Sequence, residues 1–216
     1  MLAKKIVIMG IISALVVFSG CTDKLTSSDK DKLSTEGVVA IVYDEKIYQS
    51  SIDEEVEFSK ESYENSLEYI NNSGSFTEQQ KKEQLEILEK PKTAEDVLND
   101  KIENIVLYHE ATEKGFKLDY NTAYKQSKET YDLMMENKDE NAAIINQVEN
   151  YIKEHNLTTE EYLENNAKLY QRNYAINQLK EHFNSKIFDL DKGTTMEQQF
   201  YDYTNKLVEK AEVQYF

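Results

Sequence analysis

Two short stretches carry residue types that bind metal ions, but neither has a complete ligand spacing. Residues 109–113, HEATE, begin like the H-E-x-x-H zinc motif, and Glu113 stands where the second histidine is needed. Residues 189–193, DLDKG, begin like a calcium loop but lack the third acid and the downstream Glu of the twelve-residue pattern. We therefore expect an ordinary helical His109, a solvated turn, and no metal site or cofactor.

Motifs of covalent and phosphate chemistry are missing from the sequence. It contains no Gly-x-Ser-x-Gly elbow and no phosphate-binding loop, and Cys21 is its only thiol. Carboxylate pairs on helices do not single out a catalytic site here, because the chain has 41 acidic residues. The sequence thus predicts no catalytic residues.

Aromatic side chains offer a different kind of site. The chain has 15 Tyr and 8 Phe but no Trp. Tyrosine combines an apolar ring with a polar tip, and methionine adapts its shape, so both suit promiscuous contacts with peptides. The candidate peptide-binding residues are Tyr131, Met134, Met135, Tyr170 and Tyr174. The alternative interpretation is that these side chains fill the interfaces between helices.

Charge and glycine content restrict the class of protein. The chain has 216 residues, 31% of them charged, and a formal net charge of -16. Such an acidic balance argues against nucleic-acid binding and against electrostatic attraction to an anionic membrane. One Cys excludes an internal disulfide, and 6 Gly with 1 Pro are too few for folds rich in tight turns. We expect a mainly helical protein.

The first twenty residues have the pattern of an export signal. Two lysines precede an almost unbroken apolar run over residues 6–18, and Ser19 and Gly20 then lead to Cys21. The segment resembles a bacterial lipoprotein signal, although Phe18 stands where a smaller aliphatic residue is more usual. The resemblance implies cleavage before Cys21 and lipidation of its thiol with fatty acids such as palmitate. The alternatives are an ordinary signal peptide or an N-terminal anchor helix.

Residues 21–36 form a polar segment without periodicity, rich in Ser, Thr, Asp and Lys. We expect a flexible tether, which as a coil would span about 20 Å. The folded part, residues 37–216, would then lie at the extracytoplasmic face of the bacterial cell membrane, attached through the lipid alone.

Strand signals lie at both ends of this folded part. Val38–Tyr43 is a β-branched run, Asp44-Glu45 is the expected two-residue turn, and Lys46–Tyr48 returns as a second strand. Val213–Phe216 is a third candidate. Because an unpaired terminal strand leaves an exposed edge, we expect it to pair with the first strand in a small sheet.

Helical periodicity fills the sequence between the strands. Ser50 or Ser51 is expected to cap the first helix, and Thr77, Thr93 and Thr158 each precede an acid or amide by three residues, which predicts capping boxes. The expected helices span residues 51–70, 77–90, 93–114, 121–137, 141–155, 158–183 and 196–211.

Four segments, in this order, resemble the SurA-like and PrsA-like extracytoplasmic chaperones. Residues 38–55 are similar to the strand, turn, short strand and Ser- or Thr-opened helix with which that family begins. Residues 97–119 are similar to its helix ending in Lys-Gly-aliphatic. HNLTTEEY, at residues 155–162, resembles its Gly-Leu-Thr-x-Glu-Glu-Tyr helix entry, and residues 211–215 resemble its terminal helix-to-strand step.

The chain departs from the family pattern at three points. Tyr43-Asp44-Glu45 replaces the usual Asn-Gly turn, Phe116 replaces Ile or Val, and Asn156 stands in the Gly place. The resemblance nevertheless implies a helical chaperone domain over residues 37–216 that closes with a small sheet. Such a domain would bind unfolded exported polypeptides as a holdase, without nucleotide, metal or covalent chemistry.

Members of this family often carry a parvulin-type prolyl isomerase domain between the long helix and the last helix. In this chain that junction covers only residues 187–195, and the acidic helical stretch 121–183 offers no Gly-rich, strand-rich segment. We therefore expect no isomerase activity. The alternatives are a dedicated interaction module for one envelope partner, and an enzyme whose site the sequence does not reveal.

Overall fold

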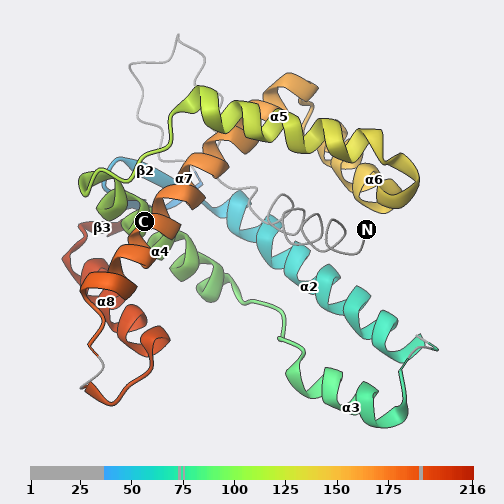
Figure 1. The fold of residues 1–216 in the computed structure, drawn as a ribbon, viewed down its shortest axis with the longest axis horizontal. Coiled ribbons are helices and arrows are strands. Elements are labelled where there is room, and N and C mark those ends of the chain that lie inside the picture. The colour runs from blue at the N-terminus through green and yellow to red at the C-terminus, as the bar shows by residue number, and fades with distance from the viewer. Residues whose placement is uncertain (1–36, 73, 75, 190–191) are drawn as a thin grey trace. The chain divides into compact units, whose positions relative to one another are not determined.

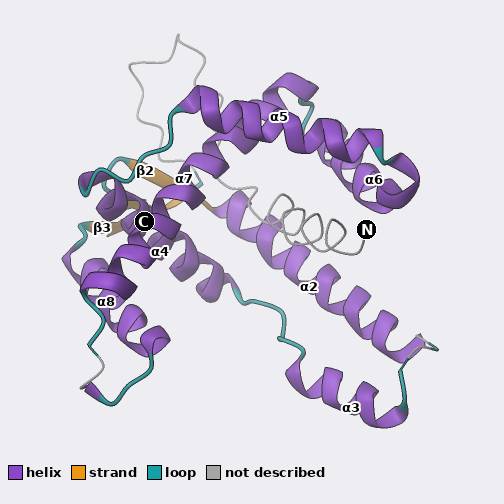
Figure 2. Ribbon diagram, in the orientation of Figure 1, coloured by secondary structure: helices purple, strands orange, loops and turns teal. Residues whose placement is uncertain are grey.

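The computed structural model describes residues 37–72, 74, 76–189 and 192–216 (Figure 1). The predicted signal peptide, Cys21 and the tether lie outside the described residues. The described part is mainly helical, with seven helices and three strands, which confirms the predicted fold class (Figure 2). It forms two compact units: the sheet unit, residues 37–102 and 212–216, and the helical unit, residues 103–211.

Three antiparallel strands form the sheet of the sheet unit, in the order β2-β1-β3. β1 spans Val38–Val42, β2 spans Glu45–Tyr48 and β3 spans Val213–Tyr215. Both other strands pair with β1, so the predicted pairing of the two ends of the folded part is confirmed. Alternate residues of β1 are buried, as expected for a strand with one covered face.

The predicted hairpin turn is wrong by one residue. Val42 pairs with Glu45, so the loop consists of residues 43–44, and its first residue adopts a φ of 53°, in the region that favours glycine. This register sets Ile47 opposite Ala40, and both side chains are fully buried. A slip of one residue would turn Ile47 to the other face. The burial of Ile47 therefore outweighs the cost of placing Tyr43 at a positive φ.

Two helices continue the sheet unit: α2, Gln49–Asn72, and α3, Glu78–Ile87. Figure 1 shows α2 leading away from the sheet and α3 following it after a turn. The predicted cap at Ser50 or Ser51 is wrong, because α2 begins directly after β2 and both serines lie in its first turn. The Ser51 hydroxyl donates to the Tyr48 carbonyl oxygen at 2.8 Å instead of accepting from an amide.

α3 begins where it was predicted and ends earlier. The capping box is confirmed: the Gln80 amide donates to Thr77 Oγ1 at 3.3 Å, and the Thr77 amide donates to Gln80 Oε1 at 3.0 Å. The helix ends at Ile87 instead of continuing to Lys90. None of its residues is buried, so no packing holds a further turn, and a residue before proline favours extended backbone.

α4, Ala94–Glu113, contributes to both units. The Asp96 amide donates to Thr93 Oγ1 at 3.2 Å, and the Thr93 amide donates to the Asp96 carboxylate at 2.8 Å, which confirms the second capping box. His109, expected to be an ordinary helical residue, keeps 41% of its side chain exposed. The buried apolar residues of α4 are Val97, Ile102, Ile105, Val106 and Ala111.

Four helices complete the helical unit: α5, Tyr120–Glu136; α6, Lys138–Glu154; α7, Thr159–Lys186; and α8, Met196–Lys210. The predicted capping box at the start of α7 is confirmed. The predicted start of α8 at Met196 is confirmed, and the other predicted helix limits in this unit differ from the observed ones by one to three residues. Within the described ranges, no helix is long and apolar enough to cross a membrane.

Two helices end in the same hydrogen-bonded motif, once with glycine and once with asparagine. Gly115 follows α4 with a φ of 85°, and Asn156 follows α6 with a φ of 50°. In both, the amide of this residue and the next one donate to carbonyl oxygens of the last turn, which is a Schellman motif. Glycine adopts this backbone without strain, whereas asparagine does so at some cost.

We expect Gly115→Ala to lower the free energy of unfolding by about 1 kcal/mol and Asn156→Gly to raise it by about 0.5 kcal/mol. No heavy atom lies within 4 Å of where a Cβ of residue 115 would stand, so the cost is one of backbone conformation. Urea unfolding of both variants measures the difference. A Gly115→Ala variant as stable as the parent chain would show that the positive φ at residue 115 does not disfavour alanine.

Candidate peptide-binding surfaces

The two stretches with metal-binding residue types do not assemble a metal centre in the part of the chain that the structure describes. His109 Nδ1 lies 3.9 Å from Glu113 Oε2 on the same helix. No three His, Cys, Asp or Glu side chains gather in a metal-binding arrangement among residues 37–72, 74, 76–189 and 192–216. Residues 190–191 of the calcium-like stretch lie outside these ranges.

The predicted peptide-binding residues come from α5 and α7. Met134 is 4% exposed and belongs to the core of the helical unit, and Tyr131 and Met135 pack against that core. The buried members of this core cluster are Met134, Ile145, Val148, Tyr162 and Leu163. Met134 therefore presents almost no surface to a partner. Tyr131, Met134 and Met135 therefore make the contacts expected of side chains that fill the interfaces between helices.

The remaining two predicted residues, Tyr170 and Tyr174, lie on α7. The hydroxyl of Tyr170 is 3.1 Å from Thr130 Oγ1, a hydrogen bond that joins α7 to α5. Tyr174, the other of the two, is 41% exposed. Of the five residues, Tyr174 is the only one classed as exposed.

Polar side chains also fix α5 to α7. The buried Ser127 hydroxyl donates to the Leu163 carbonyl oxygen at 3.1 Å. The Tyr124 hydroxyl donates to Glu160 Oε1 at 2.7 Å, and this hydrogen bond to a carboxylate raises the pKa of Tyr124 to about 12. Each contact holds one geometry between the two helices. The α5–α7 pair is thus held by polar side-chain contacts as well as by its apolar core.

A hydrogen bond between Tyr203 and Glu110 joins α8 to α4 within the helical unit. The Tyr203 hydroxyl donates to Glu110 Oε1 at 2.8 Å, and Lys114 Nζ lies 3.1 Å from the same oxygen. Burial raises the pKa of Glu110, but the bonds from Tyr203 and Lys114 lower it more, so it falls below its ordinary 4.5. Burial and the carboxylate both raise the pKa of Tyr203 above its ordinary 10.0.

This pair predicts a pH-dependent contribution to stability. A carboxyl whose pKa is depressed on folding stabilises above its unfolded value, near 4.5, and the gain is lost as pH falls through the folded value. A phenol whose pKa is raised stabilises below 10.0, and the gain is lost as pH rises through the folded value. We expect Tyr203→Phe to cost about 1 kcal/mol between these limits and less outside them.

Urea unfolding from acid to alkaline pH tests this expectation, with Tyr201→Phe as the matched control. Tyr201 is on the same helix, is 55% exposed, and should give no difference at any pH. A cost for Tyr203→Phe that stays constant across the whole pH range would contradict the proposed coupling.

The sheet unit exposes apolar side chains at the end of β3, where Tyr215 is 65% and Phe216 63% exposed, and also on the second half of α2 and on α3. We call the latter region the α2–α3 arm and define it as residues 60–72, 74 and 76–87. Tyr69 is 64% exposed and Ile87 71% exposed, and Leu85 is also exposed. The Tyr69 ring contacts the edge of Phe76, with centroids 5.9 Å apart.

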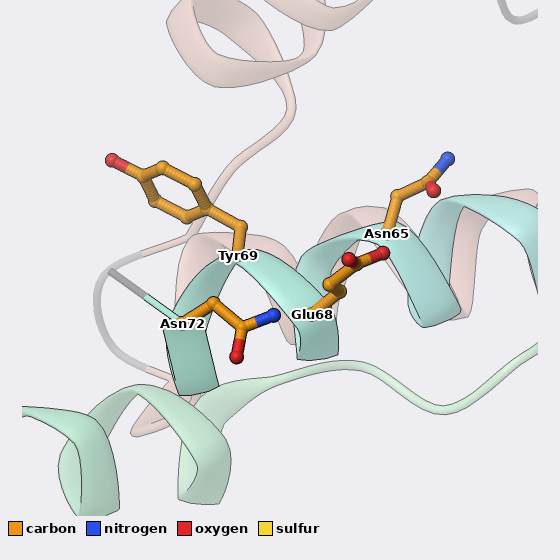
Figure 3. A pocket seen from close by; sticks show the side chains of 4 residues that line it. All are labelled: Asn65, Glu68, Tyr69 and Asn72. Atoms are coloured by element: carbon orange, nitrogen blue, oxygen red, sulfur yellow. The ribbon is translucent and has the colours of Figure 1, made fainter. Parts of the chain in front are cut away.

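A shallow pocket of about 360 Å³ opens on this arm. Its lining residues are Asn65, Glu68, Tyr69 and Asn72. Figure 3 shows that all four side chains come from the end of α2 and that the Tyr69 ring points away from Asn65. The pocket thus combines an aromatic ring, a carboxylate and two amides on one helix.

The carboxylates of the arm differ in their pairing. On α3, Lys81 lies 3.5 Å from Glu78 and Lys82 lies 3.9 Å from Glu86. On α2, the three glutamates 61, 64 and 68 are exposed, and none has an ion-pair partner among the described residues. The α2 side of the arm is therefore acidic and the α3 side is largely neutralised.

The arm was missed in the sequence because its apolar residues follow no helical stripe. Tyr69 and Ile70 are adjacent in α2, yet Ile70 is 6% exposed and Tyr69 is 64% exposed. The sequence alone allows either of them to face inward. The sequence of α3 did carry a signal that this helix buries no apolar face. Its only apolar residues, Leu85 and Ile87, stand two residues apart and cannot share one helix face.

Comparison of the chain with models of known protein families, with curated proteins and with solved structures found no match. The class that the structure itself defines is a mainly helical protein with a three-stranded antiparallel sheet that joins both ends of the folded part.

Proposed function

We propose that this protein is a membrane-anchored, extracytoplasmic lipoprotein that binds unfolded exported polypeptides and keeps them from aggregating, without isomerase activity. Two sequence features support the proposal. One is the signal-like segment that ends at Cys21. The other is the ordered resemblance to SurA-like and PrsA-like chaperones. Where that family often carries an isomerase domain, this chain has only the short junction at residues 187–195.

The observation that carries the binding function is the state of α3. This helix has 10 residues and none is buried. An isolated helix shorter than about 12–15 residues is only marginally stable in water and normally relies on an apolar face packed against the protein. α3 is held instead by its capping box and by Lys81, whose Nζ donates to the Asn71 carbonyl oxygen at 3.0 Å. An apolar segment bound to the arm would cover Leu85 or Ile87, the two exposed apolar side chains of α3.

The membrane anchor has its own test. We expect cells that make the protein to incorporate labelled fatty acid into it, and Cys21→Ser to abolish the label. Intact mass of the isolated chain should place its first residue at Cys21. Label that persists in Cys21→Ser, or a chain that begins elsewhere, would contradict the lipid anchor and favour an ordinary signal peptide or an anchor helix.

The client range is tested by crosslinking in cells that express the protein, followed by identification of the captured polypeptides. Several unrelated exported proteins, captured mainly before they fold, are the expected result. One dominant folded partner at constant stoichiometry would contradict the holdase and would support a dedicated interaction module.

A further inference from the structure

The arm presents an apolar ring beside unpaired polar groups. Tyr69 is 64% exposed, and its ring contacts that of Phe76 at a right angle, so the two rings offer adjoining apolar surface. Asn65 and Asn72 line the same shallow pocket, and neither amide has a hydrogen-bond partner among the described residues. An extended polypeptide has backbone N–H and C=O groups that need partners, and amide side chains can both donate and accept.

The same half of α2 carries a net negative charge, because it has three glutamates and only one lysine, Lys60. Glu61, Glu64 and Glu68 are spaced by three and four residues, which sets their carboxylates along one face of the helix. Like charges at this spacing repel one another, and no lysine of the described chain pairs with any of them. A partner that brings positive charge would relieve this repulsion, whereas an acidic partner would increase it.

We propose that the α2–α3 arm binds segments of unfolded polypeptide in which apolar side chains lie next to Lys or Arg. The apolar side chains pack on Tyr69 and Phe76, and the cations lie along the row formed by Glu61, Glu64 and Glu68. This inference rests on the proposed function and adds to it the chemical class of the client segment.

Three unstructured peptides test the proposal, with the same apolar side chains flanked by Lys, by Ser or by Glu. Their binding to the full chain, held in nanodiscs of neutral lipid, is measured by fluorescence anisotropy with empty nanodiscs as background. The Lys peptide should bind about 10-fold more tightly than the Glu peptide, with the Ser peptide between them. The difference should shrink at high salt, because these charges are exposed and screened.

Two pairs of variants locate the binding surface. Tyr69→Ser should weaken the binding of all three peptides, whereas Tyr201→Ser removes an exposed tyrosine of the helical unit and should change none. The triple variant Glu61→Gln, Glu64→Gln, Glu68→Gln should abolish the preference for the Lys peptide. The charge-matched triple variant Glu149→Gln, Glu154→Gln, Glu209→Gln, at exposed positions of the helical unit, should keep it.

Equal binding of the three peptides would overturn the proposed client chemistry while leaving a general holdase standing. An equal loss of preference in both triple variants would overturn the arm as its location and assign the preference to net charge. If no peptide binds and the aggregation of unfolded proteins is also unaffected, then the proposed function itself fails.

Discussion

Replacing Glu55 by alanine is expected to lower the free energy of unfolding of the sheet unit by about 3 kcal/mol. Glu55 is 9% exposed, and its Oε2 lies 3.0 Å from Nζ of Lys101, whose side chain is 11% exposed. Without this carboxylate, the Lys101 ammonium group stays nearly buried with no counter-charge. Lys92 also contacts Glu55, at 3.7 Å, but it is more exposed and keeps Asp100 at 2.7 Å.

Urea unfolding measures this loss, with Glu54→Ala as the matched control. Glu54 is the exposed neighbour of Glu55, and its removal should change stability by less than about 0.5 kcal/mol. The double variant Glu55→Leu, Lys101→Met replaces the whole pair by apolar side chains and should recover most of the loss. A Glu55→Ala variant as stable as Glu54→Ala would mean that the buried pair does not hold the unit together.

Phe183→Ala is expected to cost the helical unit about 3–5 kcal/mol. Phe183 is 2% exposed and packs against two rings of α8, with centroid distances of 5.2 Å to both Phe200 and Tyr203. Alanine leaves a cavity where α7 meets α8. We therefore also expect the amide hydrogens of α8 to exchange faster with solvent, because this ring cluster holds that helix against α7.

Two milder substitutions make the comparison specific. Phe183→Leu keeps most of the volume and should cost about 1.5 kcal/mol or less, and Tyr201→Ala removes an exposed ring of α8 and should change little. Urea unfolding and hydrogen exchange of the three variants give the ranking. A loss of less than about 1 kcal/mol for Phe183→Ala would show that α8 is held by other contacts.

The elements that could be predicted from the sequence are those whose signals are local. The capping boxes at Thr77, Thr93 and Thr158 involve residues three apart, and all three form as expected. The sheet could also be predicted, because two β-branched runs at the ends of the folded part each need a partner. The hairpin turn could not, because its position depends on which residue, Ile47, is buried by the rest of the unit.

The sequence does not predict which side chains are buried where contacts between distant parts of the chain decide it. In the sequence, Glu55 is one of several acids near the start of a helix. In the structure it is buried and paired with Lys92 and Lys101, which follow α3 in the chain. Met134 and Met135 are adjacent and equally suited to adaptable contacts, but Met134 is in the core and Met135 only borders it. Amino-acid type predicts which side chains can bind peptides, whereas helix packing decides which of them remain on the surface.

Aggregation of a refolding model protein tests the central claim most directly. Residues 22–216 are added in slight excess, light scattering is followed, and a refolding reaction limited by proline isomerisation is recorded in parallel. We expect suppressed scattering with an unchanged slow refolding phase. Unchanged scattering at every ratio would contradict this expectation and leave a single envelope partner as the better explanation.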